Sequence, residues 1–179
     1  MRRKSAGRSS DKRSPARRFL HLPGVVGVLT VCLLSCAQTL PDTARVRRVI
    51  DGDTVELADG RLVRYIGIDT PEVRRRVGDR WVDDPEPFGQ AASEANRRLV
   101  EGQRVRLEYD VQTHDRFGRL LAYVYVAVKG DGERMVNAEL MSQGFARLLT
   151  IPPDVRYVER FRALAEAARQ ARRGLWGRD

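Results

Sequence analysis

The sequence contains only two cysteines, Cys32 and Cys36, and both lie near its N-terminus. The rest of the chain therefore has no disulfide bond and no thiolate metal site. Histidine is equally scarce: His21 lies in the N-terminal segment and His114 in a predicted turn, so neither is a candidate functional residue. Stability must come from the hydrophobic core, and 179 residues suffice for one domain of ordinary size.

The sequence also lacks an apolar run long enough for a comfortable membrane span. The run Leu22–Leu34 is shorter than the about 20 residues that a transmembrane helix needs, and it contains proline and glycine. It follows a basic stretch and ends in Leu-Leu-Ser-Cys at 33–36, so residues 1–36 resemble a bacterial lipoprotein signal with Cys36 as the lipidated residue. Leu34 departs from the favoured pattern. An ordinary cleaved signal and an uncleaved anchor remain the alternatives.

These features predict export. If Cys36 is acylated, the mature protein is a membrane-anchored lipoprotein of the periplasm or cell envelope; otherwise it is secreted. The formal net charge of +9 belongs mostly to the same segment. Residues 1–35 carry eight basic side chains and one acidic side chain, a net of +7, which leaves +2 for the remainder. Any positive potential on the body of the protein must therefore be local to a site.

Beyond the signal, the chain divides into a tether, residues 37–43, and one domain, residues 44–179. Alternating apolar residues predict five strands, at Arg45–Ile50, Thr54–Leu57, Leu62–Ile68, Val105–Tyr109 and Leu120–Val128. Helical spacing predicts three helices, at Gln90–Val100, at Val136–Gln143 and after Asp154, which we take as the last N-cap. A mainly β, α+β fold follows: a five-stranded Greek-key barrel of the OB type with three helices.

One long charged stretch, Pro71–Pro87, is predicted to be an irregular loop. Loops of this length in compact domains are usually functional or mobile. Trp81 lies within it, and we expect its ring to pack the loop down onto the domain rather than to contact a substrate.

Three carboxylates, Asp51, Asp53 and Asp69, lie at the ends of the second and third predicted strands. The turn at 58–60 between those strands predicts a hairpin, which brings Asp53 and Asp69 together although they are sixteen positions apart. Two carboxylates held that close repel each other, so the arrangement favours a hard cation with oxygen ligands. An ordinary acidic rim on a hairpin is the alternative.

The pattern around these carboxylates resembles the staphylococcal nuclease, or thermonuclease, family. Asp-Gly-Asp-Thr at 51–54 is followed by Arg64, four intervening residues and Asp-Thr-Pro-Glu at 69–72. Further segments follow in the family's order, at Phe88–Ala95, Asp115–Arg119, Leu121–Tyr125, Met135–Leu140 and Gly174–Trp176. The resemblance covers residues 45–176, and so many segments in one order and spacing make it specific.

The resemblance implies the OB-type fold and a calcium site. In the matching positions the ion is held by Asp53, by Asp69 and by the backbone carbonyl of Thr70, while Asp51 reaches it through water. The carboxylate of Glu72 lies just outside this ligand set.

The resemblance also implies three catalytic residues. Glu72 matches the family's general base, and Arg64 and Arg119 match its two arginines. A guanidinium suits this work because it donates a bidentate fork to phosphate oxygens and keeps its proton.

The sequence departs from the family where aromatic residues border the nucleotide. Residues 149–152 offer no aromatic side chain, and Phe117 stands in place of a tyrosine. Tyr157 is a candidate to compensate. Binding of the nucleotide base is therefore expected to differ from that in other family members, whereas the residues that act on the phosphate are all present.

We therefore expect an exported, monomeric, calcium-dependent nuclease that hydrolyses DNA and RNA, prefers single strands and leaves 3′-phosphate ends. The alternative is a non-catalytic OB module that binds single-stranded nucleic acid or a protein partner. Inactive copies of the domain usually lose cation-binding or arginine residues, and this chain keeps all of them, which favours the enzyme.

Overall fold

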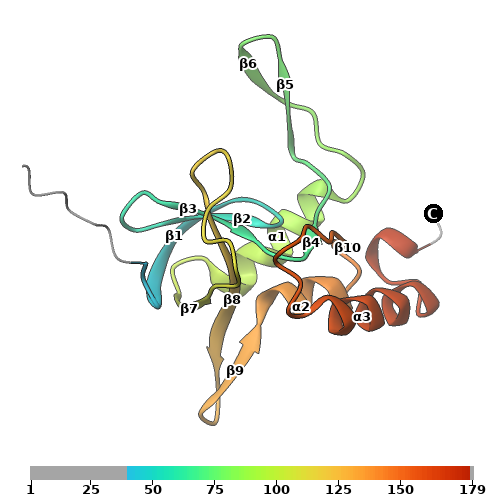
Figure 1. The fold of residues 1–179 in the computed structure, drawn as a ribbon. Coiled ribbons are helices and arrows are strands. Elements are labelled where there is room, and N and C mark those ends of the chain that lie inside the picture. Colours follow the sequence, from blue (N-terminus) through green and yellow to red (C-terminus); the bar gives the residue numbers. More distant parts are fainter. Residues whose placement is uncertain (1–39, 178–179) are drawn as a thin grey trace, which may run out of the picture. The chain divides into compact units, whose positions relative to one another are not determined.

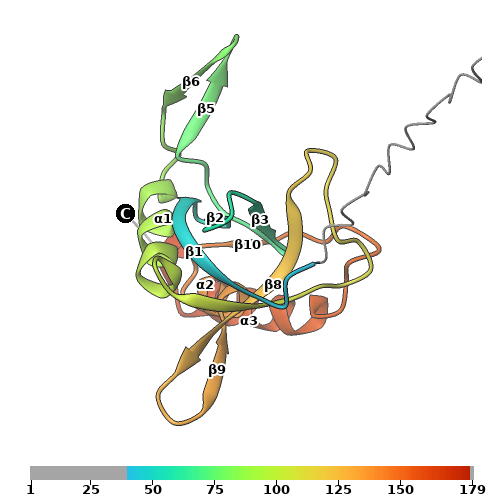
Figure 2. The same ribbon diagram turned by 90° about the vertical axis from the view of Figure 1, so that its left-hand side faces the viewer.

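The alternation of apolar side chains produces a closed barrel in the computed structural model, which describes residues 40–177 (Figures 1 and 2). Its strands are β1 (Thr43–Asp51), β2 (Thr54–Leu57), β3 (Leu62–Tyr65), β7 (Arg104–Glu108) and β8 (Leu120–Val128). Neighbours pair antiparallel in the order β3-β2-β1-β7-β8, and parallel pairing of β3 with β8 closes the sheet. The predicted five-stranded barrel is thereby confirmed. The signal at 1–36, with Cys36, lies outside the described residues.

Three further pairings surround the barrel. Strand β9 (Gly132–Met135) extends β8, and the two-residue strands β4 (Ile68–Asp69) and β10 (Arg147–Leu148) pair with each other. Strands β5 (Arg74–Val77) and β6 (Arg80–Asp83) form a hairpin that projects away from the barrel (Figures 1 and 2).

The hairpin β5–β6 overturns two expectations. The stretch 71–87 is not an irregular loop throughout, because β5 and β6 pair within it. Trp81 does not pack the segment down, since 66% of its surface stays exposed. Every residue of β6 is exposed, so the hairpin lacks the apolar, core-facing alternation by which a strand is recognised in sequence.

The three predicted helices are present as α1 (Gly89–Val100), α2 (Val136–Ser142) and α3 (Val158–Gln170), followed by a 3-10 turn η1 (Gly174–Trp176). Asp154 is not the N-cap of α3. It is buried, and its Oδ1 accepts the backbone N–H of Gln112 at 2.8 Å. No helix within residues 40–177 has the length and apolar character to cross a bilayer.

Helices α2 and α3 lie side by side against the barrel (Figures 1 and 2). The fully buried Asn137 of α2 joins two barrel segments: its Nδ2 donates to the carbonyl of Ile66 at 2.9 Å, and its Oδ1 accepts the N–H of Val124 at 2.9 Å. Gly67 has a φ of +82°, and a Cβ there would lie 2.5 Å from the ring of Phe161. Only glycine fits both the backbone and the close approach of α3.

Candidate active site

The hairpin β2–β3 places Asp53 beside Arg64. Thr54 pairs with Arg64 across the hairpin, and the carbonyl of Asp53 accepts the N–H of Tyr65 at 2.9 Å. The guanidinium of Arg64 then reaches two carboxylates: its Nη1 lies 2.8 Å from Oδ2 of Asp53, and its Nη2 lies 2.9 Å from Oδ1 of Asp69. The two carboxylates expected to share a site are thus held on one guanidinium.

The Asp53 carboxylate is buried, with 4% of the residue exposed, and both of its oxygens are bonded. Oδ2 accepts the N–H of Thr70 at 2.8 Å and its hydroxyl at 3.1 Å, and Oδ1 accepts the hydroxyl of Thr54 at 3.1 Å. Burial raises the pKa of Asp53 to about 7; Arg64 opposes this rise and Asp51 adds to it. A further positive charge at this carboxylate would therefore stabilise its ionised form.

Helix α1 fixes the position of Asp51. The carbonyl of Asp51 accepts Nδ2 of the fully buried Asn96 at 3.3 Å, and Oδ1 of Asn96 accepts the hydroxyl of Tyr65 at 3.0 Å. The Asp51 carboxylate accepts the N–H of Asp53 at 3.1 Å. Burial raises the pKa of Asp51; the bond from Asp53 opposes the rise, and the charge of Glu72 adds to it.

The sequence analysis missed Asn96 and the hydroxyls of Thr54 and Thr70. One signal was available for Asn96: it stands on the face of α1 that buries Ala92 and Ala95, where an amide must find partners. The partners of the two threonine hydroxyls became visible only once the hairpin and β4 were placed together.

Gly52 allows the start of the hairpin to approach Thr70. A Cβ on Gly52 would lie 2.6 Å from Oγ1 of Thr70 and within 2.8 Å of both its Cβ and Cγ2. Since the N–H and hydroxyl of Thr70 hold Asp53, the glycine between the two aspartates has a structural purpose beyond forming a turn.

The two remaining expected catalytic residues, Glu72 and Arg119, lie at a groove of about 700 Å³ that Asp51 also lines. Glu72 is exposed; partial burial and the charge of Asp53 raise its pKa, and Arg64 opposes the rise. Arg119 also lines a second groove, of about 560 Å³, together with Arg64. Arg119 therefore marks the point where the two grooves meet.

Asp115 holds Arg119 in this place from within the turn before β8. Oδ2 of Asp115 lies 2.7 Å from Nε of Arg119, and Oδ1 accepts the N–H groups of Arg119 at 3.0 Å and Phe117 at 2.9 Å. Although burial acts to raise the pKa of Asp115, these bonds hold it below its usual value. The carboxylate thus stays charged and leaves other donors of Arg119 free to face a phosphate.

The groove beside Arg64 has few aromatic side chains. Leu149 and Ile151 line it, and Phe117 contributes a ring that is 69% exposed. Tyr157 does not line this groove: its ring packs edge-on against Tyr123, with centroids 4.6 Å apart. The segment 149–152 therefore contributes no aromatic side chain to this groove, as its sequence predicts.

The donor chemistry of the site suits calcium, which prefers carboxylate and carbonyl oxygens. Within residues 40–177, however, no group of three or more aspartate, glutamate, histidine or cysteine side chains is arranged to hold a metal ion. Arg64 lies between two of the expected ligands, Asp53 and Asp69. The guanidinium occupies one oxygen of each carboxylate, Oδ2 of Asp53 and Oδ1 of Asp69.

Comparison with known proteins decides the family. Residues 62–178 match the family model described as Staphylococcal nuclease homologue. The chain belongs to the staphylococcal nuclease family. The resemblance inferred from the motifs is confirmed.

Family members with high similarity are nucleases by name. Thermonuclease of Staphylococcus hyicus is 38% identical over 138 residues, which cover 75% of each chain. Thermonuclease of Staphylococcus intermedius is 38% identical over 137 residues, 74% of this chain and 75% of the relative. Endonuclease YncB of Bacillus subtilis (strain 168) is 35% identical over 136 residues, 73% of this chain and 60% of the relative. These relatives support a nuclease function and a nucleic-acid substrate for this member of the family.

Proposed function

We propose that this family member is an exported calcium-dependent nuclease that hydrolyses phosphodiester bonds of DNA and RNA and leaves 3′-phosphate ends. The observation that carries the proposal is the junction of two grooves at Arg119: Glu72 lines one groove, and Arg64, which bonds to Asp53 and Asp69, lines the other. Hydrolysis of a phosphodiester needs neutralisation of the charge on the phosphate, a positioned water and assistance to the leaving oxygen. This set of side chains supplies the first two.

The arginines bind the scissile phosphate. Arg64 now bonds to two carboxylates, and Arg119 bonds to one through Nε. A phosphate entering the junction offers Arg64 equivalent oxygen acceptors, so the guanidinium can exchange a carboxylate for the substrate without an unpaired donor. Both guanidinium groups then stabilise the negative charge that develops on the phosphate oxygens.

Glu72 acts on the attacking water. Its exposed carboxylate lines the groove next to Asp51 and accepts the proton of a water that attacks phosphorus. The bond from phosphorus to the 5′-oxygen breaks, the phosphate stays on the 3′-oxygen, and the released 5′-oxygen takes up a proton from solvent. Because the bond from phosphorus to the 5′-oxygen is the one that breaks, the product carries a 3′-phosphate.

Asp53, Asp69 and the carbonyl of Thr70 would hold the calcium ion, and Asp51 would reach it through water. When bound, the ion supplies a positive charge for the pentacovalent transition state. Its support is the buried Asp53 carboxylate, which burial leaves short of positive charge even with Arg64 beside it.

Product analysis tests the reaction. A single-stranded deoxyribonucleotide of ten thymidines is digested with calcium, and the fragments are treated with polynucleotide kinase lacking phosphatase activity. Fragments that accept a 5′-phosphate directly and lose a phosphate from the 3′ end on phosphatase treatment support the proposed cleavage. Fragments with 5′-phosphate and 3′-hydroxyl ends contradict it.

A further inference from the structure

The larger groove leads from the active site to the hairpin β5–β6. Glu72 and Arg119 line it at the catalytic end, and the hairpin contributes Arg74, Trp81 and Asp83. None of the sequence motifs of the family includes this hairpin tryptophan. The groove therefore connects residues proposed for catalysis with a surface to which no function has yet been assigned.

The strand register explains why Trp81 faces the groove. Side chains alternate along β6, so Trp81 and Asp83 share one face. Asp83 pairs with Arg74 on β5, and Oδ1 of Asp83 lies 2.9 Å from Nε of Arg74. All three side chains line the groove, whereas Val82, between them on the other face, does not. The hairpin thus directs one specific face toward the active site.

The exposure of Trp81 has no structural explanation. The indole stays 66% exposed, although burying so large an apolar surface is favourable. A tryptophan that served only the fold would be packed against the barrel. Its exposure inside a groove instead leaves a flat aromatic face available to a ligand.

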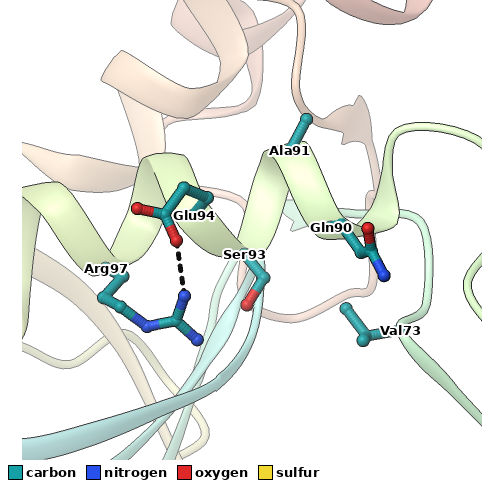
Figure 3. Close-up of a pocket in the computed structure, with 6 residues that line it drawn as sticks. All are labelled: Val73, Gln90, Ala91, Ser93, Glu94 and Arg97. Atoms are coloured by element: carbon teal, nitrogen blue, oxygen red, sulfur yellow. Dashed lines mark hydrogen bonds and ion pairs between the residues drawn. The ribbon is translucent and has the colours of Figure 1, made fainter. Parts of the chain in front are cut away.

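Helix α1 forms the opposite wall of the groove with polar side chains. Figure 3 shows Gln90 and Ser93 on the side of α1 that faces Val73, with Arg97 one turn further along and bound to Glu94. Val73, Gln90, Ser93 and Arg97 line both this pocket of about 490 Å³ and the larger groove. The groove therefore combines one aromatic platform with hydrogen-bonding groups and arginines, the composition of a single-strand binding channel.

We propose that Trp81 is a stacking platform for a base of single-stranded nucleic acid whose scissile phosphate lies at Arg119 and Glu72. The proposal rests on the proposed nuclease function and adds a second substrate contact to it. It also gives the substrate an aromatic partner on the hairpin side, whereas Leu149 and Ile151 contribute only aliphatic side chains to the groove beside Arg64. Because bases inside a duplex are already stacked on each other, this contact favours single strands.

Tryptophan fluorescence gives a test that does not depend on turnover. The chain has two tryptophans, so Trp176→Phe leaves Trp81 as the only emitter. The replacement loses no hydrogen bond, because Nε1 of Trp176 is buried without a partner. In a Glu72→Gln background, which slows cleavage, ten-thymidine DNA with calcium is expected to quench Trp81 emission saturably. The matched Trp81→Phe variant, which reports Trp176, is expected to show no change.

Steady-state kinetics provide a second test beside the fluorescence measurement. Stacking on an aromatic side chain corresponds to about 5- to 150-fold in affinity, so Trp81→Ala should raise KM for ten-thymidine DNA about tenfold and change kcat less. Trp81→Tyr should restore most of the affinity. Val82→Ala, on the other face of the same strand, should behave like wild type.

The two tests separate the failure of this proposal from the failure of the proposed function. Cleavage by wild type with unchanged KM in Trp81→Ala, or no quenching of Trp81, overturns the stacking role and leaves the nuclease intact. If wild type does not cleave DNA but Trp81 emission is still quenched saturably, the stacking role stands and the nuclease function is rejected.

Discussion

Arg64 is the residue on which the electrostatics of the site depend. Its guanidinium bonds to Asp53, to Asp69 and to the carbonyl of Ile68 at 2.9 Å, while only 14% of its side chain is exposed. A planar group with five donors can satisfy all three acceptors at once, which a single ammonium cannot do in the same geometry. The residue therefore organises the carboxylates before any ligand arrives and is positioned to receive a phosphate.

Replacing Arg64 with lysine should lower kcat/KM by about 10- to 100-fold, because hydrogen bonds to charged groups are worth about 1.5–3 kcal/mol. Arg61→Lys is the control, since Arg61 pairs with Asp59 at an exposed turn. Steady-state cleavage of single-stranded DNA measures both. Wild-type turnover in the Arg64→Lys variant would remove Arg64 from the mechanism.

Gly52 should tolerate no side chain. Gly52→Ala places a Cβ against three side-chain atoms of Thr70, so we expect a loss of about 1–3 kcal/mol in the free energy of unfolding and reduced cleavage. Gly132→Ala is the matched control, because its Cβ meets only one methyl group of Val128, at 3.2 Å. Urea unfolding of the two variants gives the comparison; equal stabilities would contradict the proposed crowding.

At the scale of elements, strands with one buried face were predictable and polar ones were not. β2 and β8 have the predicted bounds because both follow dense apolar patterns. The hairpin β5–β6 was missed because β6 buries nothing. The start of α3 was misplaced because the carboxylate of Asp154 bonds to Gln112 instead of capping the helix.

The same distinction applies to the candidate site. The carboxylates and arginines were identified from the spacing of motifs, which sequence carries directly. The residues that hold them in place were not identified, because Asn96 contacts Asp51 across 45 positions and Thr70 contacts Asp53 across 17. The position of Trp81 at the groove depends on the hairpin, so the expectation that its ring packs the segment down was wrong for the same reason.

Strand β7 and helix α3 are joined by Glu108. Its Oε1 accepts Nη1 of Arg156 at 2.9 Å and the hydroxyl of Tyr157 at 2.7 Å, just before α3 begins. Although burial acts to raise the pKa of Glu108, these bonds lower it below the usual value of 4.5. A carboxyl whose pKa is lower when folded contributes stability above its unfolded pKa and loses that stability as pH falls through the folded value.

Glu108→Gln should therefore lower the free energy of unfolding by about 1–3 kcal/mol at pH 7. The difference from wild type should shrink below pH 4.5, where the wild-type carboxyl takes up its proton. Glu159→Gln, which removes an exposed helical pair with Arg162, should cost little at either pH. Urea unfolding at several pH values measures this, and a pH-independent difference between Glu108→Gln and wild type would contradict the linkage.

At the scale of the whole molecule, two grooves meet at Arg119, so a strand whose phosphate lies there, as proposed, can extend in two directions. Residues 149–152 contribute no aromatic side chain to one groove, and the other groove carries Trp81. The barrel fixes this junction because Arg64 and Arg119 come from the parallel pair β3–β8 and the turn before it. The pairing that closes the barrel therefore also brings Arg64 and Arg119 to the same junction.

The anchor is the remaining whole-molecule prediction. Acyl chains contribute about 0.8 kcal/mol per buried methylene, so a chain lipidated at Cys36 should remain with the membrane fraction. Cys36→Ser should release the protein to the soluble fraction or leave the unprocessed precursor. Cell fractionation with an antibody against the domain measures this, and identical fractionation of the variant and wild type would show the cysteine to be incidental.

The proposed function depends most on a calcium ion bound at the Asp53 and Asp69 carboxylates. The most direct measurement is the cleavage rate of ten-thymidine DNA by wild type and by Glu72→Gln in calcium, in excess chelator, and after calcium is restored. If the proposal holds, cleavage by wild type stops with chelator and returns with calcium. Glu72→Gln then cleaves at a much lower rate at saturating calcium. Undiminished cleavage in excess chelator, or wild-type turnover in Glu72→Gln, would contradict it.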